Sequence, residues 1–131
     1  MKIDGACHCG DITFTAEIDP VQVLICHCSD CQTLSGSTYR TVAPATGDSF
    51  KLLSGTLKTY LKTAADGTRR SQTFCPECGT PIYAGPVAGE VGMLGIRVGA
   101  MKQRDQLSPS SQYYCGSAQQ WAQDLSAVTR L

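Results

Sequence analysis

The sequence shows no excess of charge of either sign, no long apolar run and no recognisable export signal. Its 131 residues include 11 basic and 11 acidic side chains, so the formal net charge is zero. Nucleic acids and anionic membranes attract basic surfaces, so this balance argues against both as partners. No stretch approaches the roughly 18 apolar residues of a membrane span, and residues 1–10 lack the apolar segment of a signal peptide. We therefore expect a cytoplasmic protein.

Long helix-forming segments are also scarce, whereas turn-forming residues are frequent. The 13 glycines and 6 prolines are spread along the chain, which is typical of short strands separated by turns. Residues 11–18 alternate apolar and polar side chains and predict a half-buried strand. Further strands are expected within residues 21–26, 38–45, 50–55, 65–75, 80–87 and 90–100, while residues 55–63 fit either a strand or a helical turn.

One helix is expected, close to the C-terminus. In residues 117–128, Trp121, Leu125 and Val128 are spaced to lie on one face of a helix. We expect Trp121 to anchor this helix to the core. Together with the strands, this pattern predicts one mainly β domain over residues 1–131 with a short C-terminal helix.

Eight cysteines are the most informative feature of the chain. A disulfide within a Cys-x-Cys turn would be strained, because the geometry of a cystine tolerates little adjustment. Thiolates on tight turns are typical zinc ligands instead, so we favour metal binding over a disulfide framework. The cysteines occur as the clusters Cys7/Cys9, Cys26/Cys28/Cys31 and Cys75/Cys78, with Cys115 alone.

The spacing of these clusters allows more than one division into metal sites. A structural zinc usually takes four sulfurs from two distant turns. One division joins two of Cys26, Cys28 and Cys31 to the Cys75/Cys78 pair. The other joins the first and third clusters into a closed site, the four-cysteine cluster (Cys7, Cys9, Cys75 and Cys78).

In the second division, Cys26, Cys28 and Cys31 remain as a cysteine trio with three protein ligands. Three ligands and one open position are the arrangement of catalytic zinc. An all-thiolate trio suits binding of an incoming thiol more than activation of water, because zinc depresses the pKa of a thiol. The trio also fits a metal-free reduced cluster or a redox sensor.

Five segments of the chain carry a family resemblance, and together they extend from Gly5 to Trp121. The sequence resembles the glutathione-dependent formaldehyde-activating family, also described as the centromere protein V domain family. The resemblance implies a β-tent (Mss4-like) fold, in which small antiparallel sheets are organised around zinc. The segments are GACHCGDITF, CHCSDCQTLSGS, GTLKTY, FCPECGTPIY and YYCGSAQQW.

The resemblance also implies an activity and the residues that carry it. The family condenses formaldehyde with glutathione to S-hydroxymethylglutathione, and it is classed with the carbon–sulfur lyases. By this resemblance the four-cysteine cluster corresponds to the structural zinc site. The trio corresponds to a second, catalytic zinc site that can be transiently occupied, with glutathione sulfur taking its open position and a small aldehyde held beside it.

Other functions remain open at the level of sequence. A non-catalytic zinc-binding or chaperone-like module and a thiol- or zinc-based redox sensor both fit the cysteine clusters. His8 and His27 lie within Cys-x-Cys turns, where they are expected to pack or to support ligands rather than to ligate. The sequence shows no identifiable clamp for the glutathione carboxylates among its local basic residues (Arg40, Lys51, Arg69, Arg70 and Arg97).

Overall fold

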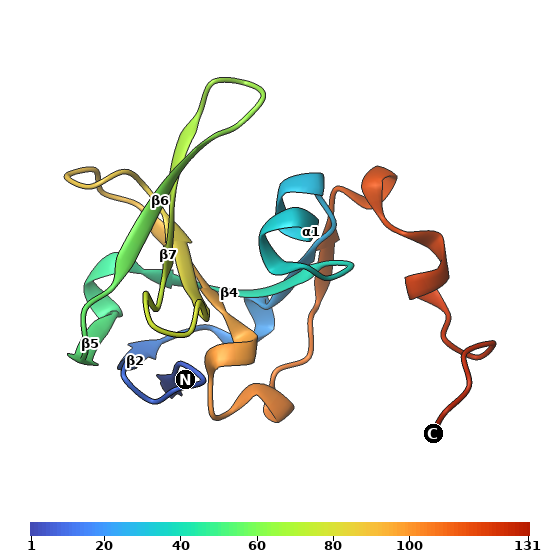
Figure 1. The fold of residues 1–131 in the computed structure, drawn as a ribbon, viewed down its shortest axis with the longest axis horizontal. Coiled ribbons are helices and arrows are strands. Elements are labelled where there is room, and N and C mark those ends of the chain that lie inside the picture. The colour runs from blue at the N-terminus through green and yellow to red at the C-terminus, as the bar shows by residue number, and fades with distance from the viewer.

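Two β-sheets form the body of the protein, as the computed structural model of Met1–Leu131 shows (Figure 1). The smaller sheet is antiparallel, in the order β1-β2-β5, with β1 at Lys2–Ala6, β2 at Thr13–Glu17 and β5 at Lys51–Ser54. The larger sheet has the order β10-β3-β4-β9-β8-β7-β6. Its strands are β3 (Leu24–Cys26), β4 (Arg40–Thr46), β6 (Lys58–Thr63), β7 (Arg69–Phe74), β8 (Pro81–Gly85), β9 (Met93–Arg97) and β10 (Ser111–Tyr113).

The strands confirm the mainly β prediction. Residues 11–18 contain β2, in which Phe14 and Ala16 point into the core. Within the ambiguous residues 55–63, Lys58–Thr63 form the strand β6, because they pair with β7 along their whole length. A turn around Gly67, whose φ is 86°, closes this hairpin. All pairs are antiparallel except β10 with β3, which is parallel.

The single α-helix, α1 (Ser29–Ser35), lies where no helix was expected. It begins after Cys28, whose Sγ accepts a hydrogen bond from the Cys31 N–H at 3.3 Å, and it ends at Gly36 with a φ of 64°. A helix of seven residues without a buried side chain carries no amphipathic stripe. The sequence pattern therefore could not reveal it. The remaining helical turns are of the 3-10 type, at Pro20–Gln22, Gly47–Ser49, Val98–Ala100, Arg104–Gln106, Cys115–Ser117 and Gln120–Gln123.

The expected C-terminal helix is wrong. Residues 117–128 contain only the end of one 3-10 turn and the four-residue turn Gln120–Gln123. Trp121 is 58% exposed, and Leu125 and Val128 are exposed as well, so Trp121 anchors nothing. The segment runs away from the sheets (Figure 1). Helices of about 12 residues are marginal without a surface on which to pack, which is why the apolar spacing alone did not produce one.

The core lies between the two sheets and includes Cys7 and Cys75 of the four-cysteine cluster. Aromatic rings cross it, with the Phe50 ring centroid 5.1 Å from that of Phe14 and 4.9 Å from that of Tyr83. On β4, Ala43 and Ala45 belong to this core. Arg40 and Val42 alternate with them and therefore face the opposite side of the sheet. No helix of the structure has the length and apolar character that crossing a membrane requires.

Candidate metal centres

The four-cysteine cluster joins the two sheets through two turns. Cys7 and Cys9 lie in the turn between β1 and β2, and Cys75 and Cys78 lie in the turn between β7 and β8. All four sulfur atoms lie within 4.8 Å of one another. The Cys9 Sγ is 3.5 Å from the Cys7 Sγ and 3.9 Å from the Cys75 Sγ. A tetrahedron of sulfurs about 2.3 Å from a central zinc has edges of about 3.8 Å, so this donor set fits zinc.

Local hydrogen bonds prepare this cluster to bind a cation. The Ile12 N–H donates to the Cys7 Sγ at 3.2 Å. The Thr80 hydroxyl lies 3.1 Å from the Cys78 Sγ, and this hydrogen bond is the main reason why the pKa of Cys78 falls to about 5. A thiol that is already ionised at neutral pH is a ready metal ligand. The backbone turn itself depends on Gly79, whose φ is 75°.

The trio lies at the junction between β3 and α1. Cys26 ends β3, Cys28 caps α1, and Cys31 lies in the first turn of the helix. The three sulfurs lie within 4.8 Å of one another, and no fourth cysteine, histidine or carboxylate belongs to the group. All three cysteines are half-buried. The structure thus groups the cysteines as four and three, and it does not bring the trio to Cys75 and Cys78.

The three thiols of the trio differ in acidity. Burial acts to raise the pKa of each thiol. In Cys31 burial and the two neighbouring sulfurs together raise the pKa to about 12. In Cys28 the effect of burial is outweighed by hydrogen bonds from the Cys31 N–H and the neighbouring thiols, with a further contribution from Lys62, so its pKa is lowered. Cys28 is therefore the most acidic thiol of the trio and ionises first.

The remaining candidate residues lie outside both clusters. His27 is 1% exposed, and its Nε2 is 2.8 Å from the Gln112 Oε1. Its ring packs edge-on against Tyr39, so His27 packs beside the trio and does not join it. His8 is exposed, and its backbone N–H donates to the Thr80 hydroxyl. Cys115 is an exposed free thiol.

Two of the basic residues among which the sequence showed no clamp, Arg40 and Arg97, lie beside the trio. Arg40 on β4 lies opposite Cys26 on β3, and Arg97 on β9 lies opposite Val42. The three thiols of the trio are close enough to act electrostatically on Arg40. Only strand pairing brings these residues together, so no local sequence signal marks them. Of the other basic residues, Lys51 lies on the smaller sheet and Arg69 is exposed.

Comparison with known proteins gives the chain a family. The model of the family described as glutathione-dependent formaldehyde-activating enzyme matches residues 2–117. The chain belongs to this family. Among solved structures, a protein from Rhodobacter sphaeroides is 22% identical, with a TM-score of 0.63 over 86% of this chain and 99% of that chain. This likeness supports the fold alone. None of the curated proteins matches the chain.

The extent of the match separates the body of this glutathione-dependent formaldehyde-activating family member from its C-terminal segment. Residues 2–117 include both groups of cysteines, helix α1 and the two arginines. Residues 118–131, which are exposed apart from the half-buried Ala118 and Ala122, lie outside the match. Two cysteine clusters that could hold metal ions agree with the family membership.

Proposed function

We propose that this protein binds zinc at both cysteine clusters and condenses a small aldehyde, such as formaldehyde, with a thiol such as glutathione. The observation that carries the proposal is the trio: three converging sulfurs with no fourth protein donor. Residues 1–131 would act as one domain, with the four-cysteine cluster in a structural role. Eight free thiols fit a reducing compartment such as the cytoplasm.

The reaction is an addition that needs no oxidant. The thiol sulfur forms a bond to the carbonyl carbon, the C=O π bond breaks, and the carbonyl oxygen takes up a proton in place of the one that the thiol lost. The product is a hemithioacetal, which is S-hydroxymethylglutathione when the substrates are formaldehyde and glutathione. The reaction is therefore limited by how much thiolate is present and by how closely the two reactants are held.

The residues of the trio and its neighbours would serve both requirements. Cys26, Cys28 and Cys31 would hold zinc, which supplies a lowered thiol pKa and fast exchange of the substrate ligand. The positive charges of Arg40 and Lys62, which both act electrostatically on trio sulfurs, favour an anionic sulfur there. The half-buried position of the trio strengthens these charge interactions, because less water screens them.

Exchange NMR with formaldehyde and glutathione tests the proposal. The zinc-loaded protein is expected to raise the rate at which formaldehyde exchanges between its free form and its glutathione adduct above the uncatalysed rate. The Cys28→Ser variant is expected to lose this acceleration, whereas the Cys115→Ser variant, which changes an exposed thiol outside both clusters, is expected to keep it. Exchange at the background rate with the zinc-loaded protein would contradict the proposal and favour a non-catalytic zinc-binding or redox-responsive protein.

A further inference from the structure

One face of the larger sheet concentrates positive charge beside the trio. Arg40 and Val42 lie on the same face of β4, because alternate residues of a strand share a face. Arg97 is the partner of Val42 across the β4–β9 pair, so it lies on that face too, diagonally next to Arg40. Cys26 is the partner of Arg40 on the other side. The register thus places the two guanidinium groups next to each other and next to the trio.

The same face continues with further polar and basic side chains. The Arg97 Nη2 donates a hydrogen bond to the Gln72 Oε1 on β7 at 3.0 Å. Arg70 lies two residues before Gln72, on the same face, and its charge acts on Arg97. Lys62 pairs with Arg70 in the β6–β7 register. Four cations from four strands therefore surround one region.

Arg40 is buried and Arg97 is half-buried, and neither has an acidic partner. Arg40 is 6% exposed, and its Nε has no hydrogen-bond partner; the Nε of Arg97 is equally buried and unpartnered. The one salt bridge of the protein joins Lys62 to Asp30 and includes neither arginine. Buried charges in proteins are normally paired, because an unpaired one is costly. This pair of arginines therefore fits an anion from outside the chain.

The trio does not supply enough negative charge to balance this face. Three thiolates that hold one zinc ion carry a formal charge of −1, and Asp30 neutralises Lys62. Arg40, Arg70 and Arg97 then share one negative charge, so two positive charges remain. A substrate with a carboxylate at one end and a thiol at the other would reduce this excess.

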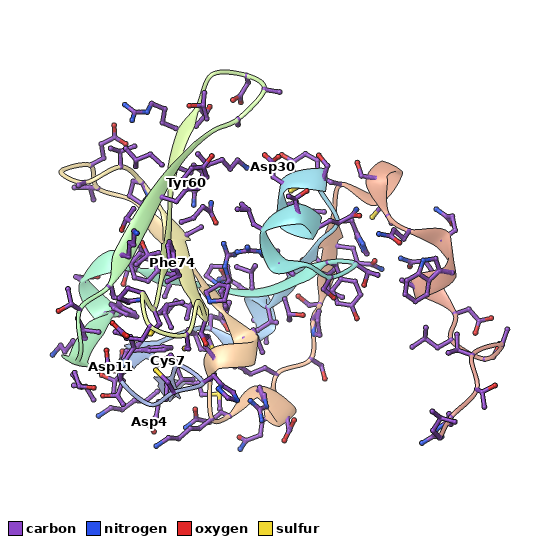
Figure 2. All side chains as sticks on the ribbon, in the orientation of Figure 1. Asp4, Cys7, Asp11, Asp30, Tyr60 and Phe74 are labelled. Atoms are coloured by element: carbon purple, nitrogen blue, oxygen red, sulfur yellow. The ribbon has the colours of Figure 1, made fainter.

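The space next to Arg40 is large enough for such a ligand. One cavity of about 360 Å³ is lined by Arg40, Gln72, Tyr60, Phe74 and Tyr83, among others. A second cavity of about 290 Å³ is lined by both Arg40 and Arg97. Arg40 thus belongs to both cavities and also adjoins the trio. Tyr60 and Phe74 lie along the hairpin that forms one wall, with Asp30 of α1 across from Tyr60 (Figure 2).

We propose that Arg40 and Arg97 bind the carboxylate of the thiol substrate, so that the site selects thiols that carry a carboxylate. For the thiol end, this inference rests on the function proposed above. A guanidinium binds a carboxylate through two parallel N–H···O hydrogen bonds, which fixes the direction of the ligand as well as its charge. The carboxylate held at the arginines would leave the sulfur of the same molecule directed toward the trio.

A binding experiment with blocked thiols tests the carboxylate end by itself. S-methylglutathione keeps both carboxylates but has no thiol, and its dimethyl ester lacks both negative charges. Calorimetric titration of the zinc-loaded protein is expected to show about tenfold or greater preference for the acid, as expected for charge-assisted hydrogen bonds, and this preference should decline with added salt. Equal affinities, or binding of neither compound, would overturn the inference.

Variants of Arg97 assign the effect to this face. Arg97→Gln is expected to lose most of the preference, and Arg97→Lys is expected to restore part of it, because lysine keeps the charge but not the two-pronged geometry. Arg69→Gln is the matched control, since Arg69 is exposed and lies on the alternate face of β7. Undiminished binding of S-methylglutathione by Arg97→Gln would overturn the inference. If the variant does not fold, the comparison of the two ligands on the unmodified protein still tests the inference.

These outcomes separate the inference from the proposed function. If the protein accelerates condensation equally for glutathione and for cysteamine, which has no carboxylate, the inference fails and the proposed function stands. If S-methylglutathione binds through Arg97 but no acceleration is found, the carboxylate site stands and the proposed function fails.

Discussion

The Lys62 Nζ lies 2.7 Å from the Asp30 Oδ2, and this ion pair ties the β6–β7 hairpin to helix α1. Burial lowers the pKa of Lys62, but the hydrogen bond to Asp30 and the attraction of Asp30, Cys28 and Cys31 outweigh burial and raise it. The pair therefore lies next to the trio, between the hairpin and the helix. It joins an element that carries cysteines to one that carries part of the cavity wall.

Loss of this ion pair is expected to destabilise the fold slightly. Lys62→Gln should lower the free energy of unfolding by about 0.5–1 kcal/mol, the upper range for a partly exposed ion pair. Lys58→Gln is the matched control, since Lys58 lies on the same strand and face without an acidic partner. Urea unfolding of the three proteins measures the difference. Equal stabilities of the two variants would show that the pair contributes nothing.

Metal removal and cysteine substitution are expected to separate the two clusters. Cys75 is fully buried in the core, so Cys75→Ser should unfold the protein or lower its melting temperature strongly, as a chelator should. Cys28→Ser should keep the fold and lose one zinc per chain, because Cys28 lies at the half-buried edge of α1. Metal analysis and thermal unfolding, with Cys115→Ser as control, measure both effects. Similar collapse of both variants would mean that all seven clustered cysteines are structural.

Gly5 is expected to tolerate no side chain. A Cβ at this position would overlap the ring of Phe14, which is buried and stacked on Phe50 and cannot move aside. Gly5→Ala should therefore lower the free energy of unfolding by about 1–3 kcal/mol, the usual cost of overpacking a core. Gly99→Ala is the control, because a Cβ there meets no atom within 4 Å. Denaturant unfolding of both variants checks the prediction, and equal losses would contradict it.

The turn of the β6–β7 hairpin is expected to respond to acid. The Asp66 Oδ1 accepts a hydrogen bond from the Thr68 N–H at 2.8 Å, and this bond lowers the pKa of Asp66 below its ordinary 3.8. Because the pKa of Asp66 is lower in the folded than in the unfolded state, the ionised carboxylate stabilises the turn at pH values above the unfolded-state pKa. This stabilisation is lost as the pH falls through the folded-state pKa. NMR titration should show the Thr68 amide moving below pH 3.8 in the protein but not in Asp66→Asn. A midpoint above 3.8 would refute the assignment.

Local patterns predicted the strands better than the helices. The alternation around Phe14 predicted β2, because side chains of a strand alternate faces whatever the strand pairs with. Helix α1 gave no such signal, since it is short, buries no residue and begins at a cap supplied by Cys28. The pattern of Trp121 and Leu125 predicted a helix that does not form, because no surface covers the segment.

The sequence by itself determined the chemistry that this protein offers: turn-borne thiolates in three clusters, a mainly β chain and a family resemblance. Only the tertiary structure decided how those groups combine. The β1–β2 turn packs against the β7–β8 turn, and the His8 N–H donates a hydrogen bond to Thr80 between them. This packing brings four sulfurs together and leaves the trio as a separate group. The pairing of β4 with β3 and β9 places Arg40 and Arg97 beside those three. Strand register acts between residues far apart in the chain, so no local pattern could reveal that the trio has a basic neighbour.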